Sequence, residues 1–227
     1  MGYYADKLSG ERLRKCYEIA PPRVQQYLAA EIQHVLSRVG VEYTVLELGC
    51  GYGRVVFELA RIVRQVVGID TSLHSLALAQ QLAKPEITCE FISMDAANLG
   101  FADDTFDAVV CIQNGICAFG IDQVLLLREA LRVTRQGGTV LLSSYAERFW
   151  PHRYQWFELQ AGRGLIGEID HDSTRNGVIV CKDGFRAGAM SPNDFRELCL
   201  QLGLRPKIEE VDGSSLFCEV NVSSKLH

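Results

Sequence analysis

The 227-residue sequence lacks several features that would assign it to a class of protein at once. No apolar run approaches the roughly 20 residues that span a bilayer. The N-terminal stretch "MGYYADKLSGERLRK" lacks the apolar core of a signal peptide. The net charge of -5 disfavours non-specific attraction to nucleic acid or to an anionic membrane. We therefore expect a cytoplasmic protein that binds neither nucleic acid nor a membrane.

The cysteines also lack the spacing of a metal or redox site. The chain has eight, but no C-x-x-C pair, and the closest two are Cys111 and Cys117. Cys50, Cys89 and Cys181 lie, like Cys111, among apolar residues typical of strands. Small buried thiols in a reducing compartment are the simplest interpretation, so we predict no disulfide and no bound metal.

The middle of the chain alternates between two kinds of apolar pattern. Five short apolar runs predict buried strands: "TVLELG", "QVVGID", "ITCEFISM", "DAVVCIQN" and "TVLLSSY". Amphipathic runs between them predict helices, one capped by Ser72 and one ended by Gly137 and Gly138. This order predicts an α/β fold with a doubly wound, mostly parallel sheet and helices on both faces.

Both flanks depart from this alternation. The first forty residues predict two helices, with a break at Gly10 and an end at Gly40. The stretch after Tyr145 is aromatic and irregular, and residues 165–185 read as two strands joined by a polar turn. A helix capped by Ser191 and two strand-like runs, "RPKIEEVD" and "SLFCEVNV", close the chain.

Three glycines, Gly49, Gly51 and Gly53, follow the first predicted strand, where ligands of open α/β sheets bind. Glycine permits positive φ and close approach of a ligand to the backbone. The dinucleotide fingerprint G-x-G-x-x-G would need its third glycine one residue later, where Arg54 stands. Glu47 precedes the loop and would repel a pyrophosphate but attract a cation.

Acidic residues also end the next two strands. Asp70 ends the second, at the place suited to a carboxylate that binds ribose hydroxyls. Met94, Asp95 and Ala96 end the third, where they could flank a purine. The ligand implied is a nucleoside with cationic character and no phosphate.

The runs "ELGCGYG", "GID", "MDAANLGF", "FDAVVCIQN" and "LREALRVTRQGG" together resemble the successive motifs of class I S-adenosylmethionine-dependent methyltransferases. The resemblance covers about residues 44–144 and implies a seven-stranded sheet whose last strand is antiparallel. It implies S-adenosyl-L-methionine as cofactor and methyl transfer by in-line displacement without a metal. By position, the methionine part would contact Glu47 and the backbone of Gly49, Cys50, Gly51 and Gly53, the ribose Asp70 and Thr71, and the adenine Met94, Asp95 and Ala96.

The same resemblance implies roles for the flanks within a single domain of residues 1–227. Residues 1–40 would form an N-terminal helical lid, with Tyr4 and Lys7 as candidate cofactor contacts. Residues 41–145 would form the cofactor-binding core, and residues 146–190 an acceptor-side insert with a β-hairpin after the fifth strand. Residues 191–227 would supply the closing helix and strands.

The acceptor would lie near the end of the fourth strand, at Gln113 and Asn114, and beside the aromatic stretch that begins at Tyr145. His152 is the best candidate for a general base, because histidine titrates near neutrality. A packing or surface histidine is the competing interpretation. We predict a catalytic group of His152, Tyr145 and Asn114, with Gln113 near the sulfonium.

The acceptor class follows from an absence. Amino-methylating DNA enzymes of this superfamily carry D/N-P-P-Y/F after the fourth strand, where this chain has "IQNGICAF". We therefore expect a small-molecule acceptor with an oxygen, nitrogen or sulfur nucleophile, and a monomer or homodimer. The alternatives are a silent cofactor-binding module, an RNA or protein methyltransferase, an NAD-dependent dehydrogenase, or an arsenite-type enzyme that uses thiolates such as Cys117 and Cys181.

Overall fold

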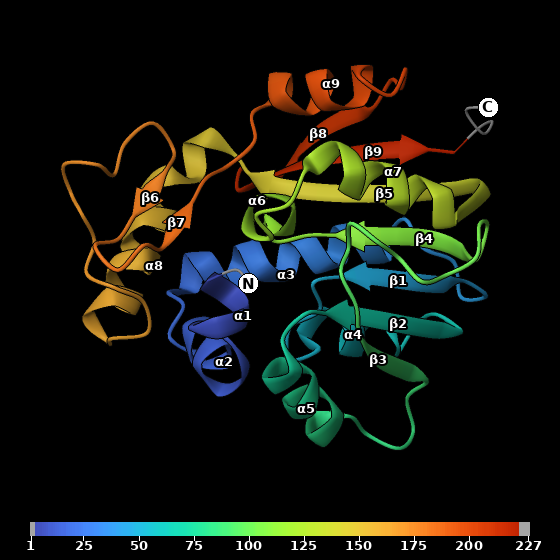
Figure 1. The fold of residues 1–227 in the computed structure, drawn as a ribbon, viewed down its shortest axis with the longest axis horizontal. Coiled ribbons are helices and arrows are strands. Elements are labelled where there is room, and N and C mark those ends of the chain that lie inside the picture. The colour runs from blue at the N-terminus through green and yellow to red at the C-terminus, as the bar shows by residue number, and fades with distance from the viewer. Residues whose placement is uncertain (1–2, 223–227) are drawn as a thin grey trace.

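A seven-stranded sheet organises the molecule in the computed structural model, which describes residues 3–222 (Figure 1). The strand order is β3-β2-β1-β4-β5-β9-β8. β1 to β5 are parallel, and β9 runs antiparallel between β5 and β8. The bounds are β1 (Thr44–Leu48), β2 (Gln65–Asp70), β3 (Cys89–Ser93), β4 (Phe106–Cys111), β5 (Thr134–Tyr145), β8 (Lys207–Val211) and β9 (Ser215–Asn221). The predicted doubly wound sheet with a final antiparallel strand is confirmed.

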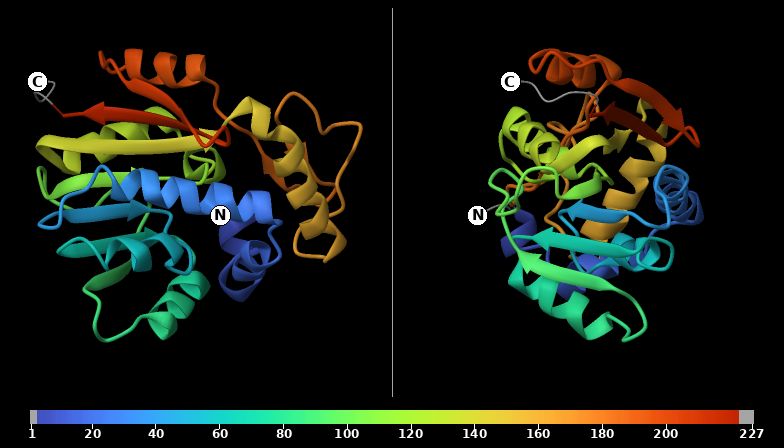
Figure 2. Two further views of the ribbon diagram at one scale, coloured as in Figure 1. Left: turned by 180° about the vertical axis from the view of Figure 1, so that it is seen from behind. Right: turned by 90° about the vertical axis from the view of Figure 1, so that its right-hand side faces the viewer.

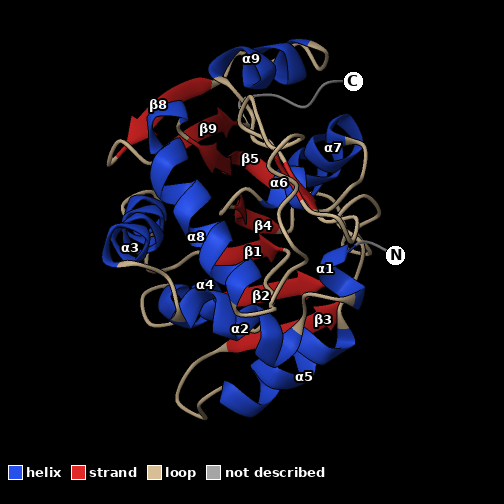
Figure 3. Ribbon diagram, turned by 90° about the vertical axis from the view of Figure 1, so that its left-hand side faces the viewer, coloured by secondary structure: helices blue, strands red, loops and turns tan. Residues whose placement is uncertain are grey.

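Helices cover both faces of this sheet (Figures 2 and 3). α3 (Pro22–Leu36) and α4 (Arg54–Leu59) bury apolar side chains against one face. The other face packs against α6 (Gly115–Ala118), α7 (Gln123–Val133) and α9 (Pro192–Leu200). α5 (Leu73–Leu82) lies beside β2 and β3. Within the described residues, no helix combines the length and apolar character needed to cross a bilayer.

Several predicted helix boundaries hold because local capping fixes them. The Ser72 hydroxyl accepts the Ser75 N–H at the start of α5. Ser191 forms a capping box with Asp194 at the start of α9, with Pro192 in the first turn. The N-terminal segment breaks before Gly10, which separates α1 (Tyr3–Asp6) from α2 (Gly10–Glu18).

The stretch after Tyr145 is helical, so the prediction of irregular structure there is wrong. A short 3₁₀ turn η1 (Glu147–Phe149) leads into α8 (Trp150–Gly162). Its buried residues, Arg153, Trp156, Phe157 and Gln160, recur at helical spacing. Aromatic side chains on every side of this segment concealed that period in the sequence.

Two further boundaries differ from expectation. α7 ends at Val133, and Gly137 and Gly138 lie inside β5, where the pairing with β4 shifts register. A side chain on Gly138 would come within 2.6 Å of the Asp107 carbonyl oxygen, so close strand packing requires glycine there. The two segments of the predicted hairpin meet at an antiparallel bridge between Ile169 and Cys181. The paired strands themselves, β6 (Ile179–Val180) and β7 (Arg186–Ala187), lie later in the chain than the sequence indicated.

Segments far apart in the chain pack together beyond the carboxyl ends of the strands. α1, α2 and the start of α3 share an apolar cluster with α8 and the β6–β7 hairpin. The Arg12 guanidinium donates to the carbonyl oxygens of Leu165 and Gly164 at 2.7 and 2.6 Å. The Tyr3 hydroxyl donates to Asp183 at 2.5 Å. We call this assembly of α1, α2, α8 and the hairpin the cap.

Candidate functional site

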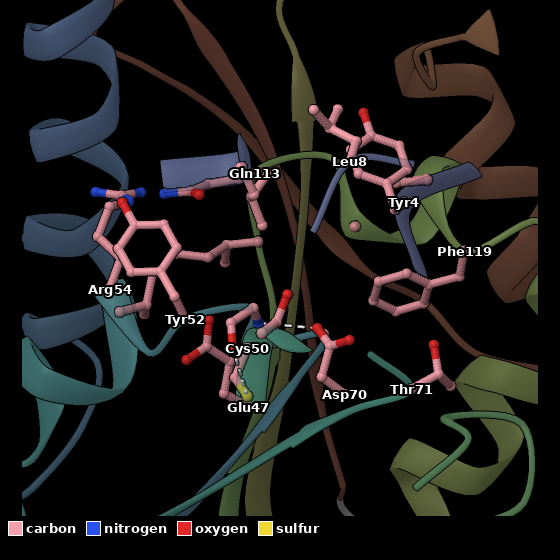
Figure 4. A pocket seen from close by; sticks show the side chains of 18 of the residues that line it. Tyr4, Leu8, Glu47, Cys50, Tyr52, Arg54, Asp70, Thr71, Gln113 and Phe119 are labelled. Carbon is pink, nitrogen blue, oxygen red and sulfur yellow. Dashed lines mark hydrogen bonds between the residues drawn. The ribbon is translucent and has the colours of Figure 1, made fainter. Parts of the chain in front are cut away.

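A cavity of about 610 Å³ lies between the cap and the carboxyl ends of the parallel strands (Figure 4). Strand register aligns its components, since Leu48 of β1 pairs with Ile69 of β2, and Asp70 pairs with Ser93 of β3. The loops that follow β1, β2 and β3 therefore open side by side onto the cavity. This is the edge of an open α/β sheet where ligands bind.

The glycine loop forms the floor of the cavity. Gly49, Gly51 and Gly53 have φ of 73°, 54° and 88°, a left-handed conformation that other residues rarely adopt. The Gly51 N–H donates to one oxygen of Asp70, and the Ser72 N–H donates to the other, both at 2.8 Å. Asp70 therefore fixes the loop while its carboxylate still lines the cavity.

Phe119 lies directly over the first glycine of this loop. A Cβ atom on Gly49 would collide with the Phe119 ring. Figure 4 shows that ring below Tyr4 and above Asp70 and Thr71. Phe119 therefore lines the cavity beside the glycine loop, and no role was predicted for it.

Glu47 is a buried acid at the edge of the cavity. It is 4% exposed, and its Oε2 atom completes no hydrogen bond. Burial raises the pKa of Glu47 to about 8, although the nearby charge of Arg54 acts in the opposite direction. A cationic ligand would favour the ionised carboxylate and supply the missing partner.

Two polar side chains near Glu47 are also incompletely paired. Arg54 begins α4, and its guanidinium lies 5.0 Å from the centre of the Tyr17 ring. Its Nε and Nη2 atoms, and the Nε2 atom of Gln113, are buried without hydrogen-bond partners. A buried acceptor and buried donors that face one cavity match a ligand carrying both an ammonium and a carboxylate group. In the sequence, Arg54 stands where the dinucleotide fingerprint has its third glycine, and no role was predicted for it.

Most of the predicted cofactor-binding residues lie together around the cavity. Those that line it are Tyr4, Glu47, Gly49, Cys50, Gly51, Asp70, Thr71, Met94, Asp95, Ala96 and Gln113. Gly53 lies behind the loop at the N-cap of α4, packed near Phe57 and Phe91. The Lys7 ammonium donates to the Asp183 carbonyl oxygen at 3.1 Å and does not line the cavity.

The predicted catalytic group is not assembled. Tyr145 lines the cavity, and burial raises its pKa to about 12. His152 is exposed, packs near the Phe149 ring and does not line the cavity. Asn114 is buried, and its amide donates to the Gly188 carbonyl and accepts from Ser144. Of the three, only Tyr145 faces the site.

The cap supplies an apolar and aromatic half of the cavity. Trp156 donates through Nε1 to the Cys16 carbonyl oxygen at 2.8 Å, which locks α8 against α2. The cap residues that line this half, beyond Tyr4, are Leu8, Leu13, Cys16, Tyr17, Trp156, Phe157 and Gln160. The sequence indicated the two segments but not these side chains, because their meeting depends on how the cap packs.

Thiolate chemistry has little support in this arrangement. Burial raises the pKa of Cys16 to about 12 and those of Cys117 and Cys181 to about 11, so all three thiols stay protonated near neutrality. Across residues 3–222 no group of three possible metal ligands of the His, Cys, Asp or Glu type occurs. The third glycine of the loop, Gly53, comes one residue earlier than in the dinucleotide fingerprint, which disfavours the dehydrogenase alternative.

The sheet order, the left-handed glycine loop and the acids behind it define a class I S-adenosylmethionine-dependent methyltransferase fold. Residues 45–138 match a family model described as a methyltransferase domain. The resemblance inferred from the sequence motifs is therefore confirmed, and S-adenosyl-L-methionine is the cofactor that this class of enzyme uses.

Known proteins with similar sequences and structures are consistent with this class. A 2-methyl-6-phytyl-1,4-hydroquinone methyltransferase of Synechocystis is 29% identical over 137 residues, which cover 56% of this chain and 42% of that protein. A demethylmenaquinone methyltransferase of Paenarthrobacter aurescens is 32% identical over 156 residues, which cover 66% of this chain and 57% of that protein. A solved structure from Pyrococcus horikoshii has a TM-score of 0.67 at 22% identity and covers 97% of both chains. The chain spans about half the length of the curated relatives it matches.

Proposed function

We propose that this chain transfers the methyl group of S-adenosyl-L-methionine to a small, largely apolar acceptor that lies under the cap. The observation that carries the proposal is the set of unpartnered polar atoms on Glu47, Arg54 and Gln113 beside the glycine loop. Unsatisfied buried polar atoms are rare and costly, so a ligand that pairs with them is strongly favoured.

Each part of the cofactor has candidate partners in the cavity. Glu47 would bind the ammonium of the methionine part, and Arg54 would bind its carboxylate through the unpartnered Nε and Nη2 atoms. Asp70 and Thr71 would bind the ribose hydroxyls. Met94, Asp95 and Ala96, which follow β3, would surround the adenine.

The bound cofactor supplies a methyl group on a sulfonium, which a nucleophile can take in one displacement. The task of the chain is then to orient the acceptor, and good orientation alone can remove up to roughly 7–11 kcal/mol of barrier. The aromatic half of the cavity suits a flat apolar acceptor, since Tyr17, Trp156 and Phe157 present ring surfaces.

The acceptor would enter with a nucleophile that needs little help to lose a proton. The side chains that line the aromatic half include no histidine, and burial raises the pKa of both Tyr4 and Tyr145. A neutral amine or an electron-rich carbon or oxygen fits this environment better than an alcohol that requires a strong base.

A second candidate function follows from the same observation. A cavity without an evident base would also suit a protein that binds the cofactor but transfers nothing. The two functions differ in turnover and not in cofactor affinity.

Calorimetry with S-adenosylhomocysteine tests the cofactor half, and a panel of acceptors with S-adenosylhomocysteine release as readout tests the transfer. We expect micromolar-range binding and turnover of at least one neutral aromatic acceptor. Turnover should fall in Trp156→Ala and stay unchanged in the matched surface variant His152→Ala. Failure of the folded protein to bind S-adenosylhomocysteine would exclude both functions, and binding without turnover across the panel would favour the silent module.

A further inference from the structure

A buried acid outside the cavity lies behind the end of β4. Glu31 on α3 is 0% exposed. Its Oε1 accepts hydrogen bonds from the hydroxyls of Ser143 at 2.7 Å and Ser215 at 2.9 Å. Its Oε2 accepts the backbone N–H of Gln113 at 3.0 Å. A buried carboxylate is costly unless such donors surround it, so its place here calls for a reason beyond packing.

The backbone that Glu31 holds is strained. Gln113 and Asn114 have φ of 56° and 62°, which puts two consecutive non-glycine residues in the left-handed region. Such strain persists only where surrounding groups over-determine the conformation. The Gln113 N–H is held twice, by Glu31 and by the Ser143 hydroxyl at 2.8 Å. The Asn114 amide, bonded to Ser144 and Gly188, fixes the second residue.

This turn aims Gln113 at the reacting region. Gln113 follows β4, lines the cavity, and leaves its Nε2 donor buried without a partner. Figure 4 shows its side chain between Arg54 and Tyr4, above the glycine loop. A change in the φ of Gln113 would swing this amide, so whatever fixes the backbone also fixes the donor.

We propose that Glu31 is a positioning residue for methyl transfer, whose ionised carboxylate holds the Gln113–Asn114 turn so that the Gln113 amide points into the cavity. The proposal rests on the proposed function, since it assigns Gln113 a contact with the cofactor or the acceptor. Glu31 itself touches neither.

The groups around Glu31 make this support sensitive to pH. Burial raises the pKa of Glu31 to about 7, against the hydrogen bonds from Ser143 and Ser215 and the charge of Arg54 on α4. Tyr27 on α3, Tyr145 on β5 and Cys111 on β4 also face it. When Glu31 is protonated, its own O–H is a fourth donor among the Ser143 and Ser215 hydroxyls and the Gln113 N–H. One of these three hydrogen bonds to Glu31 must then weaken. The turn should therefore loosen as the pH falls through the pKa.

Amide hydrogen exchange of Gln113, followed by NMR without any ligand, tests the positioning role. In the wild type, the protection of Gln113, corrected for intrinsic exchange, should fall as the pH is lowered from about 8 to about 6, while that of Leu46 in β1 should not fall, because the fold as a whole is no less stable at the lower pH. Glu31→Gln should keep an intermediate protection that no longer depends on pH. In Glu31→Leu the protection of Gln113 should fall by at least about tenfold, because its backbone N–H loses a hydrogen bond to a charged group.

Ser215→Ala is the matched control, because it removes a partner of Glu31 that does not touch Gln113. We expect it to leave Gln113 protected. Wild-type protection of Gln113 in Glu31→Leu, or an equal loss at Leu46, would overturn the positioning role. If Glu31→Leu does not fold, a pH dependence that persists in Glu31→Gln would overturn it instead. These outcomes are independent of S-adenosylhomocysteine binding, whose absence would instead overturn the proposed function.

Discussion

Glu47 and Arg54 line the same cavity, one just before the glycine loop in the chain and one just after it, and both leave buried polar atoms without hydrogen-bond partners. Glu47 offers a hydrogen-bond acceptor, and Arg54 offers two donors. One cavity therefore holds a partner for a positive group and a partner for a negative group of the same ligand.

The Glu47 carboxyl should release a proton when the cofactor binds. Its pKa of about 8 keeps it mostly protonated at about pH 7, and an ammonium beside it favours the carboxylate. Calorimetric titrations with S-adenosylhomocysteine in two buffers of different ionisation enthalpy should show release of up to about one proton per site. Glu47→Gln should bind more weakly and release none. The same heat in both buffers for the wild type would contradict this assignment.

Arg54 should recognise only the amino-acid end of the cofactor. We expect Arg54→Met to weaken S-adenosylhomocysteine binding by about tenfold or more, since a charge-assisted pair is lost. Binding of 5'-methylthioadenosine, which lacks that end, should change little. Arg61→Met is the matched control. Arg61 is an exposed arginine just after the same helix, and it forms an ion pair with Glu58. Equal weakening of both ligands by Arg54→Met would show that Arg54 acts through the loop.

Asp70 should matter for both ligands. Asp70→Ala removes the candidate ribose contact and the acceptor that holds the Gly51 and Ser72 N–H groups, so affinity should fall by at least about tenfold for each ligand. Part of the loss of affinity will come from a less stable fold, because Asp70 also orders the glycine loop. Asp122→Ala likewise removes a carboxylate that accepts two backbone N–H groups, at the N-cap of α7, and should lower the melting temperature without weakening the binding of either ligand. Unchanged affinity in Asp70→Ala would exclude the ribose role.

Glu31 should make the stability of the fold depend on pH. Its folded pKa lies above its unfolded value of 4.5, so it is protonated in both states at low pH and contributes no difference there. As the pH rises from about 4.5 to about 7, Glu31 ionises in the unfolded chain but stays mostly protonated in the folded protein. The free energy of unfolding therefore falls, by at most about 3 kcal/mol. Urea unfolding should show a smaller decline in Glu31→Gln.

The control for this comparison is Glu58→Gln, which changes an exposed acid on α4 that pairs with Arg61. We expect it to follow the wild-type decline, because exposed ion pairs contribute little. Parallel pH profiles for the wild type and Glu31→Gln would show that the buried acid does not titrate in this range.

The parts of the fold that could be predicted from sequence are those with local signals. The glycines before α4 need positive φ, Ser72 and Ser191 cap helices, and the five short apolar runs form strands, although β3 at the edge of the sheet is only partly buried. These signals placed Glu47 and Asp70 correctly beside one another. Arg54 and Glu31 were not assigned roles, because their significance lies in partners that are missing or remote in the chain.

The predicted catalytic group is not assembled at the cavity, because its choice depended on packing. His152 was chosen for its chemistry, but the helical register of α8 turns Arg153, Trp156 and Phe157 inward and leaves His152 outside. Asn114 was placed correctly at the end of β4, yet Ser144 and Gly188 occupy its amide. Which face of a helix meets a cavity depends on contacts between distant segments, and no local pattern encodes it.

The cap draws its two walls from opposite sides of residues 45–138, the part of the chain that matches the methyltransferase-domain family. Arg12 and Tyr3 join those walls by hydrogen bonds to Gly164, Leu165 and Asp183. Under the proposed function, evolution or an engineer could alter the recipient of the methyl group through the cap while leaving the glycine loop and its acids unchanged. Any such exchange would have to transplant both walls as a matched pair, because each carries half of the bonds that close the chamber.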